Sequence, residues 1–323
     1  MPGAAPKVTV IIPTYNRAQF LGAAIHSVLQ QDFQDFELLI VDDGSTDQTR
    51  QVVQSCADAR LQYFTQEHKG VSAAVNHGIR CARGEFIARL DSDDIWLPEM
   101  LALSVATLAA QTEVGLVYGR AQGMTANGNL LNDFRGRPAW FPGEAFRSML
   151  YGDFTCNITI MVRRLCFERA GWFDETLPLS EDWDMWLRVA EHYRFAFIDR
   201  IVARYRYHGD NITGTNSKYF AEHLDGRIKI LDKVFARTDL PPAILQMKTM
   251  VYFNLHTFTG CCWLGQKNYR RAFECFGQAV RTRNRSALTF ARIIWGVLAH
   301  RALAKVKWGR VLMDKVAQWG RRL

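Results

Sequence analysis

The sequence lacks the features of two large classes of protein. It has no run of about eighteen apolar residues, the length that a membrane-spanning helix needs, and its closest approach is the stretch 293–299. It also has no cysteine pair spaced CxxC, and its seven cysteines, an odd number, are scattered at positions 56, 81, 156, 166, 261, 262 and 275. This usage does not predict a disulfide framework, so we expect reduced thiols and a cytoplasmic location.

The common motifs that hold phosphate or a catalytic metal are missing as well. No two glycines are separated by a single residue and no GxxxxGK[ST] sequence occurs, which excludes the dinucleotide fingerprint and the phosphate loop of ATPases and GTPases. No two of the eight histidines lie four residues apart, and no GxSxG sequence occurs. The acidic run from Asp91 is not a calcium loop, because its sixth position is Trp96, where that loop requires glycine. A nucleotide bound by this chain would need another means of neutralising its phosphates.

Positive charge is concentrated in one segment. The 323 residues carry a net charge of +8, and residues 281–323 contain eleven Lys and Arg against one acid, Asp314. The rest of the chain is therefore slightly acidic. The chain is 48% apolar and 22% charged, which is typical of a folded protein with one large domain and a smaller one. A basic tail on a near-neutral body indicates an anionic partner for the tail alone.

Short apolar runs alternate with helical patterns over the first 120 residues. The runs that predict strands are 8–12, 36–41, 61–64, 86–90 and 114–118, and segments of helical periodicity separate them, among them 20–29 and 70–82. This alternation predicts an α/β fold with a parallel sheet covered on both faces. In such sheets ligands bind beyond the carboxyl ends of the strands.

Polar clusters follow three of these predicted strands. The first strand is followed by residues 14–16, the second by Asp42 and Asp43, and the fourth by the run 91–94 with three carboxylates. Carboxylates this close repel one another, and a divalent cation would relieve the repulsion; the alternative is a solvated turn. For Asp42 and Asp43 the alternatives are a contact to a base N–H or a simple turn and helix cap.

A third acidic cluster lies at 180–183, with the sequence Ser-Glu-Asp-Trp, before a helical stripe of apolar residues at 183, 186, 187 and 190. One interpretation is that Ser180 caps this helix and that the two acids favour its positive end. The other is that one carboxylate acts as a general base at the rim of a site.

Taken together, these segments closely resemble the family 2 glycosyltransferases, which have the GT-A fold. The resemblance spans about the first 213 residues, in the order and spacing of the family. It is carried by VTVIIPTYNR (8–17), FELLIVDDGSTDQT (36–49), GVSAAVNHGIRCARGEFIARLDSDD (70–94), RRLCFERAGWFDETLPLSEDWDMWLRV (163–189) and YRYHGDNIT (205–213). The resemblance implies transfer of a sugar, with inversion, from a nucleoside-diphosphate sugar, above all a UDP-sugar, to a hydroxyl of a glycan or lipid-linked acceptor. The implied role is the synthesis of a cell-surface polysaccharide, lipopolysaccharide or other glycan.

The resemblance also implies residues that bind the donor. Pro13, Thr14 and Tyr15 would line the nucleoside pocket, Asp43 would contact the base, and Asp91 would lie near the ribose.

Roles for the reaction follow in the same way. Asp93 would bind Mn²⁺ or Mg²⁺ bridging the diphosphate, and Asp182 would be the catalytic base, next to Glu181 in the donor site. His208 falls where relatives place a late metal or phosphate ligand, although an ordinary strand-end histidine is an equal alternative.

One position departs from the family. Members often read GVSAARNRGI, whereas this chain reads GVSAAVNHGI, with Val75 where arginine is common. The contacts to the diphosphate are therefore open, and His77, Lys69 or Arg80 are candidates to compensate.

The sequence predicts a catalytic domain over 1–213 and an all-α extension over 214–323 that ends in a basic amphipathic tail. With tryptophans among its basic residues, the segment 281–323 resembles a membrane-surface helix, which would place the protein peripherally on the inner membrane face. A helix packed on its own protein is the alternative. No nucleic-acid-binding module accompanies these residues, so we do not expect nucleic acid as a partner.

Two rival functions use the same body. A non-catalytic scaffold with a degenerate transferase body would act through its tail, although all three acidic clusters are kept. A nucleotidyltransferase would need a basic triphosphate loop after the first strand, and residues 13–17 make a poor one.

Overall fold

The computed structural model describes residues 5–177, 179–211 and 219–283. They form two compact units. The first comprises residues up to 149 together with 153–211, and the second comprises 150–152 and the helices from 219 onward.

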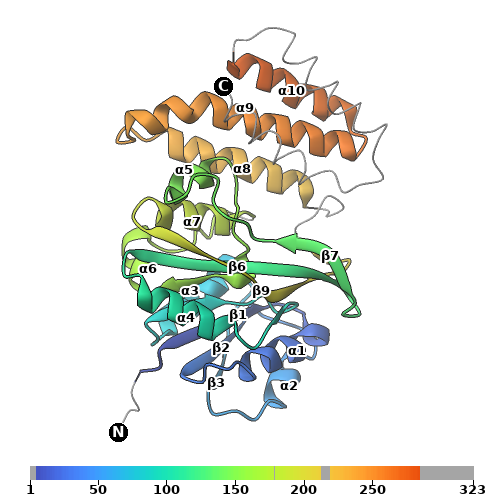
Figure 1. Cartoon of the computed structure of the whole chain (residues 1–323). Coiled ribbons are helices and arrows are strands. Elements are labelled where there is room, and N and C mark those ends of the chain that lie inside the picture. Colours follow the sequence, from blue (N-terminus) through green and yellow to red (C-terminus); the bar gives the residue numbers. More distant parts are fainter. Residues whose placement is uncertain (1–4, 178, 212–218, 284–323) are drawn as a thin grey trace. The chain divides into compact units, whose positions relative to one another are not determined.

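Four parallel strands form one half of the sheet in the first unit (Figure 1). Their order is β3-β2-β1-β4, and the strands are β1 (Val8–Thr14), β2 (Phe36–Asp42), β3 (Leu61–Thr65) and β4 (Phe86–Arg89). The helices that connect them are α1 (Ala18–Leu29), α2 (Thr49–Gln54) and α3 (Val71–Cys81). Every residue of β1, β2 and β4 is buried, which is why these segments are continuous apolar runs and not alternating ones.

The first strand is longer than the sequence predicts. The prediction ends it at Ile12, before Pro13, but β1 continues to Thr14, where Pro13 is in register with Val41 of β2. On its other side β1 pairs with β4 only from Val8 to Ile11. Pro13 lies beyond that ladder, so its missing N–H removes no hydrogen bond between strands.

The other half of the sheet is mixed. β8 (Met161–Arg163) lies antiparallel between β4 and β6 (Val114–Thr125), β9 (Arg194–Tyr207) runs parallel to β6, and β5 (Ile95–Trp96) and β7 (Leu130–Arg135) pair antiparallel with β9 and β6. Helices in this part are α4 (Met100–Ala110), α5 (Ala145–Leu150), α6 (Leu165–Ala170) and α7 (Glu181–Ala190), and a 3₁₀ turn covers Asn157–Thr159. The pairing of β9 with β5 brings residues 203–208 back beside the acidic turn after β4.

Within the second unit, the described residues after 211 form helices and no strand. They are α8 (Phe220–Phe235), α9 (Pro242–Gly265) and α10 (Tyr269–Arg283). Leu224, Trp263, Ala272 and Phe276 form their buried cluster. Gly260 lets α9 and α10 approach closely, since a Cβ at this position would lie 2.5 Å from the ring of Phe276.

No helix among the described residues combines the length and the apolar content that crossing a bilayer requires. The predicted membrane-surface tail lies, from residue 284 onward, outside the described residues.

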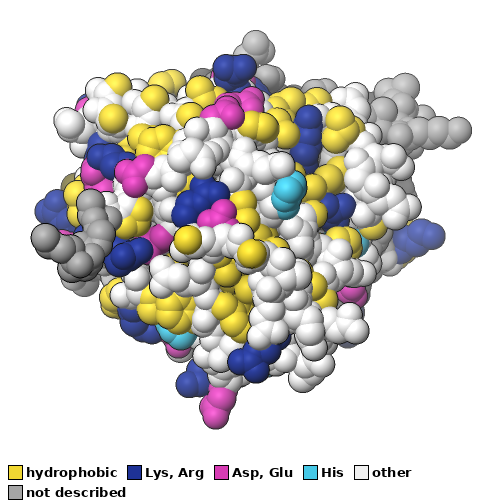
Figure 2. Space-filling model, turned by 90° about the horizontal axis from the view of Figure 1, so that it is seen from below, with side chains coloured by type: hydrophobic (Ala, Val, Ile, Leu, Met, Phe, Trp, Pro, Cys, Tyr) yellow, Lys and Arg dark blue, Asp and Glu magenta, His cyan; other side chains and the backbone are white. Residues whose placement is uncertain are grey.

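Charges of both signs are interspersed on the face of the molecule seen from below. Figure 2 shows Lys and Arg side chains lying among acidic and apolar ones over the described residues of this face. This distribution agrees with a body whose acids and bases nearly balance once residues 281–323 are set aside.

Candidate functional site

The loops after β1 and β2 are joined at the carboxyl edge of the parallel strands. The backbone N–H of Asn16 donates to Ser45 Oγ at 2.8 Å, and Thr46 N donates to Asn16 Oδ1 at 2.8 Å. Asp47 Oδ2 accepts from the N–H of Ala18, the first residue of α1, at 3.0 Å. Asn16 has a left-handed backbone, with φ of 50°, a conformation that asparagine tolerates better than most residues. The two predicted polar clusters are therefore one folded surface.

Asp43 is a buried carboxylate surrounded by donors. Its Oδ1 accepts from Gln66 Nε2 at 2.7 Å and from the N–H of Lys69 at 2.9 Å. Its Oδ2 accepts from the N–H of Gly70 at 2.8 Å and lies 2.8 Å from His68 Nδ1. The side chain is only 4% exposed. Asp43 thus organises the loop that leads into α3.

The neighbouring Asp42 is also used by the protein. Its Oδ1 accepts from the N–H of Ser45 at 2.8 Å, and its Oδ2 accepts from the hydroxyl of Tyr63 at 2.5 Å. Burial first, and then the bond to Asp42, raise the pKa of Tyr63 well above its ordinary value. The hydrogen bonds of Asp42 are therefore those of the turn interpretation of this acidic pair. A ligand contact at Asp43 remains a prediction.

The three predicted nucleoside residues differ in exposure. Pro13 and Thr14 are buried, and the hydroxyl of Thr14 has no hydrogen-bond partner among the described residues. Tyr15 is 40% exposed, and its ring stacks on the imidazole of His68 with centroids 4.0 Å apart and an interplanar angle of 19°. An aromatic face and an unused buried hydroxyl are suited to a planar, hydrogen-bonding ligand.

Around the turn after β4, each carboxylate has its own partner. Asp91 Oδ1 accepts from Arg89 Nε at 2.9 Å. Asp93 Oδ2 lies 2.9 Å from His208 Nε2 and 3.6 Å from Arg17 Nε. The structure thus brings together Asp93 and His208, which are 115 residues apart in the chain.

Asp94 ties this turn to the end of β9. Its Oδ1 accepts from the N–H of Arg206 at 2.7 Å, and Arg206 Nε donates to the carbonyl oxygen of Asp93 at 2.8 Å. Burial, followed by the charges of Asp93 and Asp91, raises the pKa of Asp94 well above its ordinary value. Arg206 is a residue that sequence reasoning did not single out, because its two partners in this turn lie more than a hundred residues away in the chain.

The acidic pair on α7 approaches the same turn. Glu181 is the first residue of α7, is 8% exposed, and its Oε1 lies 3.4 Å from Arg89 Nη1. Burial, followed by the charge of Asp182, raises the pKa of Glu181 to about 7. Asp182 is partly exposed and accepts from the N–H of Trp183 at 2.7 Å. Arg89 therefore links Glu181 to Asp91.

Helix α7 is held in place by two tryptophans. Trp183 Nε1 donates to the carbonyl oxygen of Met149 at 2.9 Å, and Trp186 Nε1 donates to Asn157 Oδ1 at 3.3 Å. Ser180, which precedes the helix, has a left-handed backbone with φ of 64° instead of the extended conformation typical of an N-cap. The interpretation in which Ser180 caps the helix is wrong, because Ser180 makes no side-chain capping hydrogen bond to α7.

Comparison with known proteins gives a consistent family. The model of "Glycosyl transferase family 2" matches residues 9–168. The chain is 27% identical over 234 residues to a chondroitin synthase of Escherichia coli, covering 72% of this chain and 33% of that protein. It is 28% identical over 223 residues to the E. coli UDP-Glc:alpha-D-GlcNAc-diphosphoundecaprenol beta-1,3-glucosyltransferase WfgD, covering 68% and 84%. The chain spans about a third of the length of the chondroitin synthase and of several further curated relatives.

Solved structures share the architecture. Residues 1–349 of S. aureus TarS in complex with UDP-GlcNAc match with a TM-score of 0.65 at 21% identity, over 85% of this chain and 81% of that one. The mannosyltransferase PcManGT of Pyrobaculum calidifontis, in complex with GDP-Man and Mn²⁺, matches with a TM-score of 0.60 at 21% identity, over 98% and 85%. The fold is that of the GT-A glycosyltransferases, and the chain is a member of glycosyltransferase family 2.

Proposed function

We propose that the protein is an inverting, metal-dependent glycosyltransferase that takes its sugar from a nucleoside-diphosphate donor, in particular a UDP-sugar. The observation that carries the proposal is the convergence of Asp91, Asp93, Glu181 and His208, from three parts of the chain, around the turn after β4. TarS binds UDP-GlcNAc and PcManGT binds GDP-Man, which supports a nucleotide-sugar donor.

The donor set beside Asp93 fits a divalent ion shared with a ligand. No group of three or more His, Cys, Asp and Glu side chains able to hold a metal occurs among the described residues. Asp93 and His208 supply a carboxylate and an imidazole, ligands that suit Mn²⁺, and Asp93 suits Mg²⁺. The remaining positions would come from the diphosphate and water. A bound ion would stabilise the negative charge that develops on the departing diphosphate.

The nucleoside of the donor would lie along the carboxyl edge of the parallel strands, at the loops after β1 and β2. The exposed ring of Tyr15 offers a stacking face, and the buried hydroxyl of Thr14 offers a hydrogen bond. Because four protein donors already surround the carboxylate of Asp43, a base N–H would take the place of the His68 imidazole, which is 55% exposed. Asp91 would contact the ribose from beside Arg89, and Pro13 would support the floor of this pocket.

Asp182 is the proposed general base. It is the partly exposed member of its pair, whereas burial favours the protonated form of Glu181. Asp182 would accept the proton of the acceptor hydroxyl as that oxygen attacks the anomeric carbon opposite the leaving diphosphate. A single displacement of this kind inverts the centre.

The acceptor is proposed to be a glycan or a lipid-linked sugar in surface-glycan synthesis. WfgD acts on a diphosphoundecaprenol-linked sugar, and the basic segment 281–323 would hold the protein peripherally at an anionic membrane surface. Cosedimentation with vesicles of anionic and of neutral lipid tests the membrane part, with a chain ending at residue 283 as the control.

The first experiment is thermal unfolding with UDP, GDP and dTDP, each with and without Mn²⁺, and with ATP and NAD as controls. A ligand at 100 times its Kd stabilises a fold by about 2.7 kcal/mol, which gives a measurable shift in Tm. We expect a Mn²⁺-dependent shift with UDP. No shift with any diphosphate would contradict the proposal and favour a non-catalytic scaffold.

A further inference from the structure

An arginine lies buried beneath the acidic edge of the sheet. Arg89 is the last residue of β4, and the three residues before it, Phe86, Ile87 and Ala88, are apolar and buried. Its own side chain is 10% exposed. A buried guanidinium destabilises a fold unless carboxylates pair with it, so its presence in a central strand needs an explanation.

The guanidinium bridges two of the predicted site residues. Its Nε and its Nη2 both lie 2.9 Å from Asp91 Oδ1, and its Nη1 lies 3.4 Å from Glu181 Oε1. Burial lowers the pKa of Arg89, but the charges of Asp91, Glu181 and Asp182 outweigh it and raise this pKa above its ordinary value. Arg89 is therefore a permanent positive charge within the acidic cluster.

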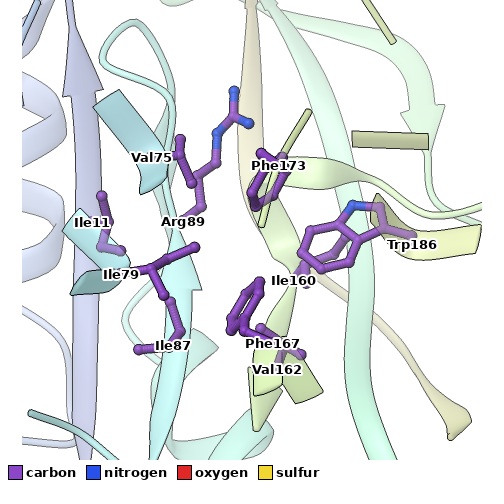
Figure 3. A pocket seen from close by; sticks show the side chains of 10 residues that line it. All are labelled: Ile11, Val75, Ile79, Ile87, Arg89, Ile160, Val162, Phe167, Phe173 and Trp186. Carbon is purple, nitrogen blue, oxygen red and sulfur yellow. The ribbon is translucent and has the colours of Figure 1, made fainter. Parts of the chain in front are cut away.

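The stem of Arg89 lies beside Val75, the position at which the sequence departs from its family. Both side chains line a small apolar cavity between the sheet and α3, α6 and α7, together with Ile11, Ile79, Phe173 and Trp186 (Figure 3). Val75 is 2% exposed. The cavity has room for roughly one water molecule, so a longer side chain at position 75 would not fit inside it and would have to extend out of it, as the guanidinium of Arg89 does in Figure 3.

The candidates named from sequence to replace an arginine at position 75 have other partners. His77 Nδ1 lies 3.0 Å from Gln66 Oε1, and Arg80 lies 3.9 Å from Glu175 and over the ring of Trp172. Lys69 donates through its backbone to Asp43. None of these three contacts reaches Asp91 or Glu181.

We propose that Arg89 supplies from β4 the positive charge that α3 lacks at position 75, and that it positions Asp91 and Glu181 for donor binding and for catalysis by Asp182. This inference rests on the proposed function. It makes Arg89 and residue 75 interchangeable sources of one charge: a family sequence places the arginine on the helix, and this chain places it on the strand.

The test is a relocation of the arginine. Arg89→Leu removes the charge, Val75→Arg adds one, and the double variant moves it while conserving side-chain volume within about one methylene group. With a Mn²⁺-dependent UDP-sugar assay, we expect Arg89→Leu to lower kcat/KM about 100-fold, the scale of a misplaced catalytic group. The double variant is expected to recover at least tenfold of that loss and most of any loss in Tm.

Arg89→Lys separates positioning from folding. It keeps the charge but not the two-pronged contact to Asp91, so we expect a Tm near that of the wild type and a lower kcat with KM changed less. Wild-type kcat and KM in Arg89→Leu would overturn the inference. So would a double variant that folds and binds UDP but is no more active than Arg89→Leu.

Failure of the proposed function gives a different pattern. A wild-type protein whose Tm does not respond to any nucleoside diphosphate refutes the glycosyltransferase proposal before any variant is made. If the Tm of the wild type responds to a nucleoside diphosphate, but the effects of Arg89→Leu and Val75→Arg on kcat/KM and Tm simply add in the double variant, only the inference about Arg89 is refuted.

Discussion

The two acidic clusters at the ends of β2 and β4 look alike in the sequence and differ in the structure. Asp43 is surrounded by backbone N–H groups, an amide and an imidazole, which all come from the loop 66–70. The carboxylates of 91–94 lie close enough to raise the pKa of Asp94, and their partners are Arg89 at the end of β4, and Arg206 and His208 at the end of β9 and just after it. The carboxylate of Asp43 in the first cluster therefore has its hydrogen bonds satisfied by a neighbouring loop. The second keeps like charges together, which is the arrangement that a cation relieves.

The largest effect on kcat is expected from a substitution of Asp182. Asp182→Asn removes the proposed base, and we expect kcat to fall by roughly 10²–10⁴ while the UDP-induced shift in Tm stays unchanged. The matched control is Asp184→Asn on the same helix, where Asp184 Oδ2 accepts from Arg188 Nη2 at 2.7 Å. That change should lower Tm and leave kcat within a fewfold. Equal kcat in Asp182→Asn and the wild type would refute the assignment.

Metal dependence sharpens the contrast between the clusters. Asp93→Ala should abolish the Mn²⁺-dependent part of the UDP shift, because it removes the carboxylate beside His208. Glu175→Ala, which alters an exposed acid beside Arg80, is the control and should keep that shift. The measurement is Tm against UDP concentration with and without Mn²⁺. An unchanged Mn²⁺ response in Asp93→Ala would show that the ion binds elsewhere.

At the β2 end, stability is the main readout. Asp43→Asn replaces an acceptor of several hydrogen bonds by an amide, and we expect the free energy of unfolding to fall by about 1–3 kcal/mol in denaturant titrations. KM for the donor should rise as well. Asp42→Asn replaces one of the two oxygens that accept from Ser45 and Tyr63 by an NH2 group, and it is expected to destabilise without that rise. A similar KM effect in both variants would argue against a base contact specific to Asp43.

The smallest effect is a pH dependence of stability from Glu181. The pKa of Glu181 is about 7 in the folded state, above the 4.5 of an ordinary glutamate. Between pH 4.5 and pH 7 the folded state therefore holds a proton that the unfolded chain has lost. Stability from this group is present below pH 4.5 and declines as pH rises to 7. Relative to Glu181→Gln, wild-type stability should fall by up to about 1.4 kcal/mol per pH unit in that window. A difference independent of pH would show that Glu181 ionises normally.

The parallel half of the sheet is readable from the sequence and the mixed half is not. Strands β1, β2 and β4 are buried on both faces, so each is a largely apolar run before turn residues, and β3 is a shorter, half-buried run. β5 and β8 have two and three residues, too few for any periodicity. β6 continues past its predicted end at 118 through Gly119 and Gly123, which resemble breakers. A Cβ there would lie 2.6 Å from Val202 and 2.8 Å from Tyr207, so these glycines permit the close approach of β9.

The candidate site divides in the same way. Acids at strand ends identify the edge of the sheet, and Asp91 and Asp93 lie on it as local patterns predict. The contacts that join this turn to α7 and to the end of β9 cross more than ninety residues, as between Arg89 and Glu181 or Asp94 and Arg206. Arg89 ends an apolar strand and gives no local signal that it is buried.

The link from Asp94 to Arg206 has a consequence for insertions and deletions. Asp94 directly precedes Ile95, which pairs with Arg204 of β9. The bond from Asp94 to Arg206 therefore fixes the register of β9 two residues before His208. Successive residues of a strand point to opposite faces, so a shift of one residue in β9 would turn the imidazole away from Asp93. Length changes are therefore expected to be tolerated in the exposed turn 126–129, and to be lethal to metal binding anywhere in 203–207.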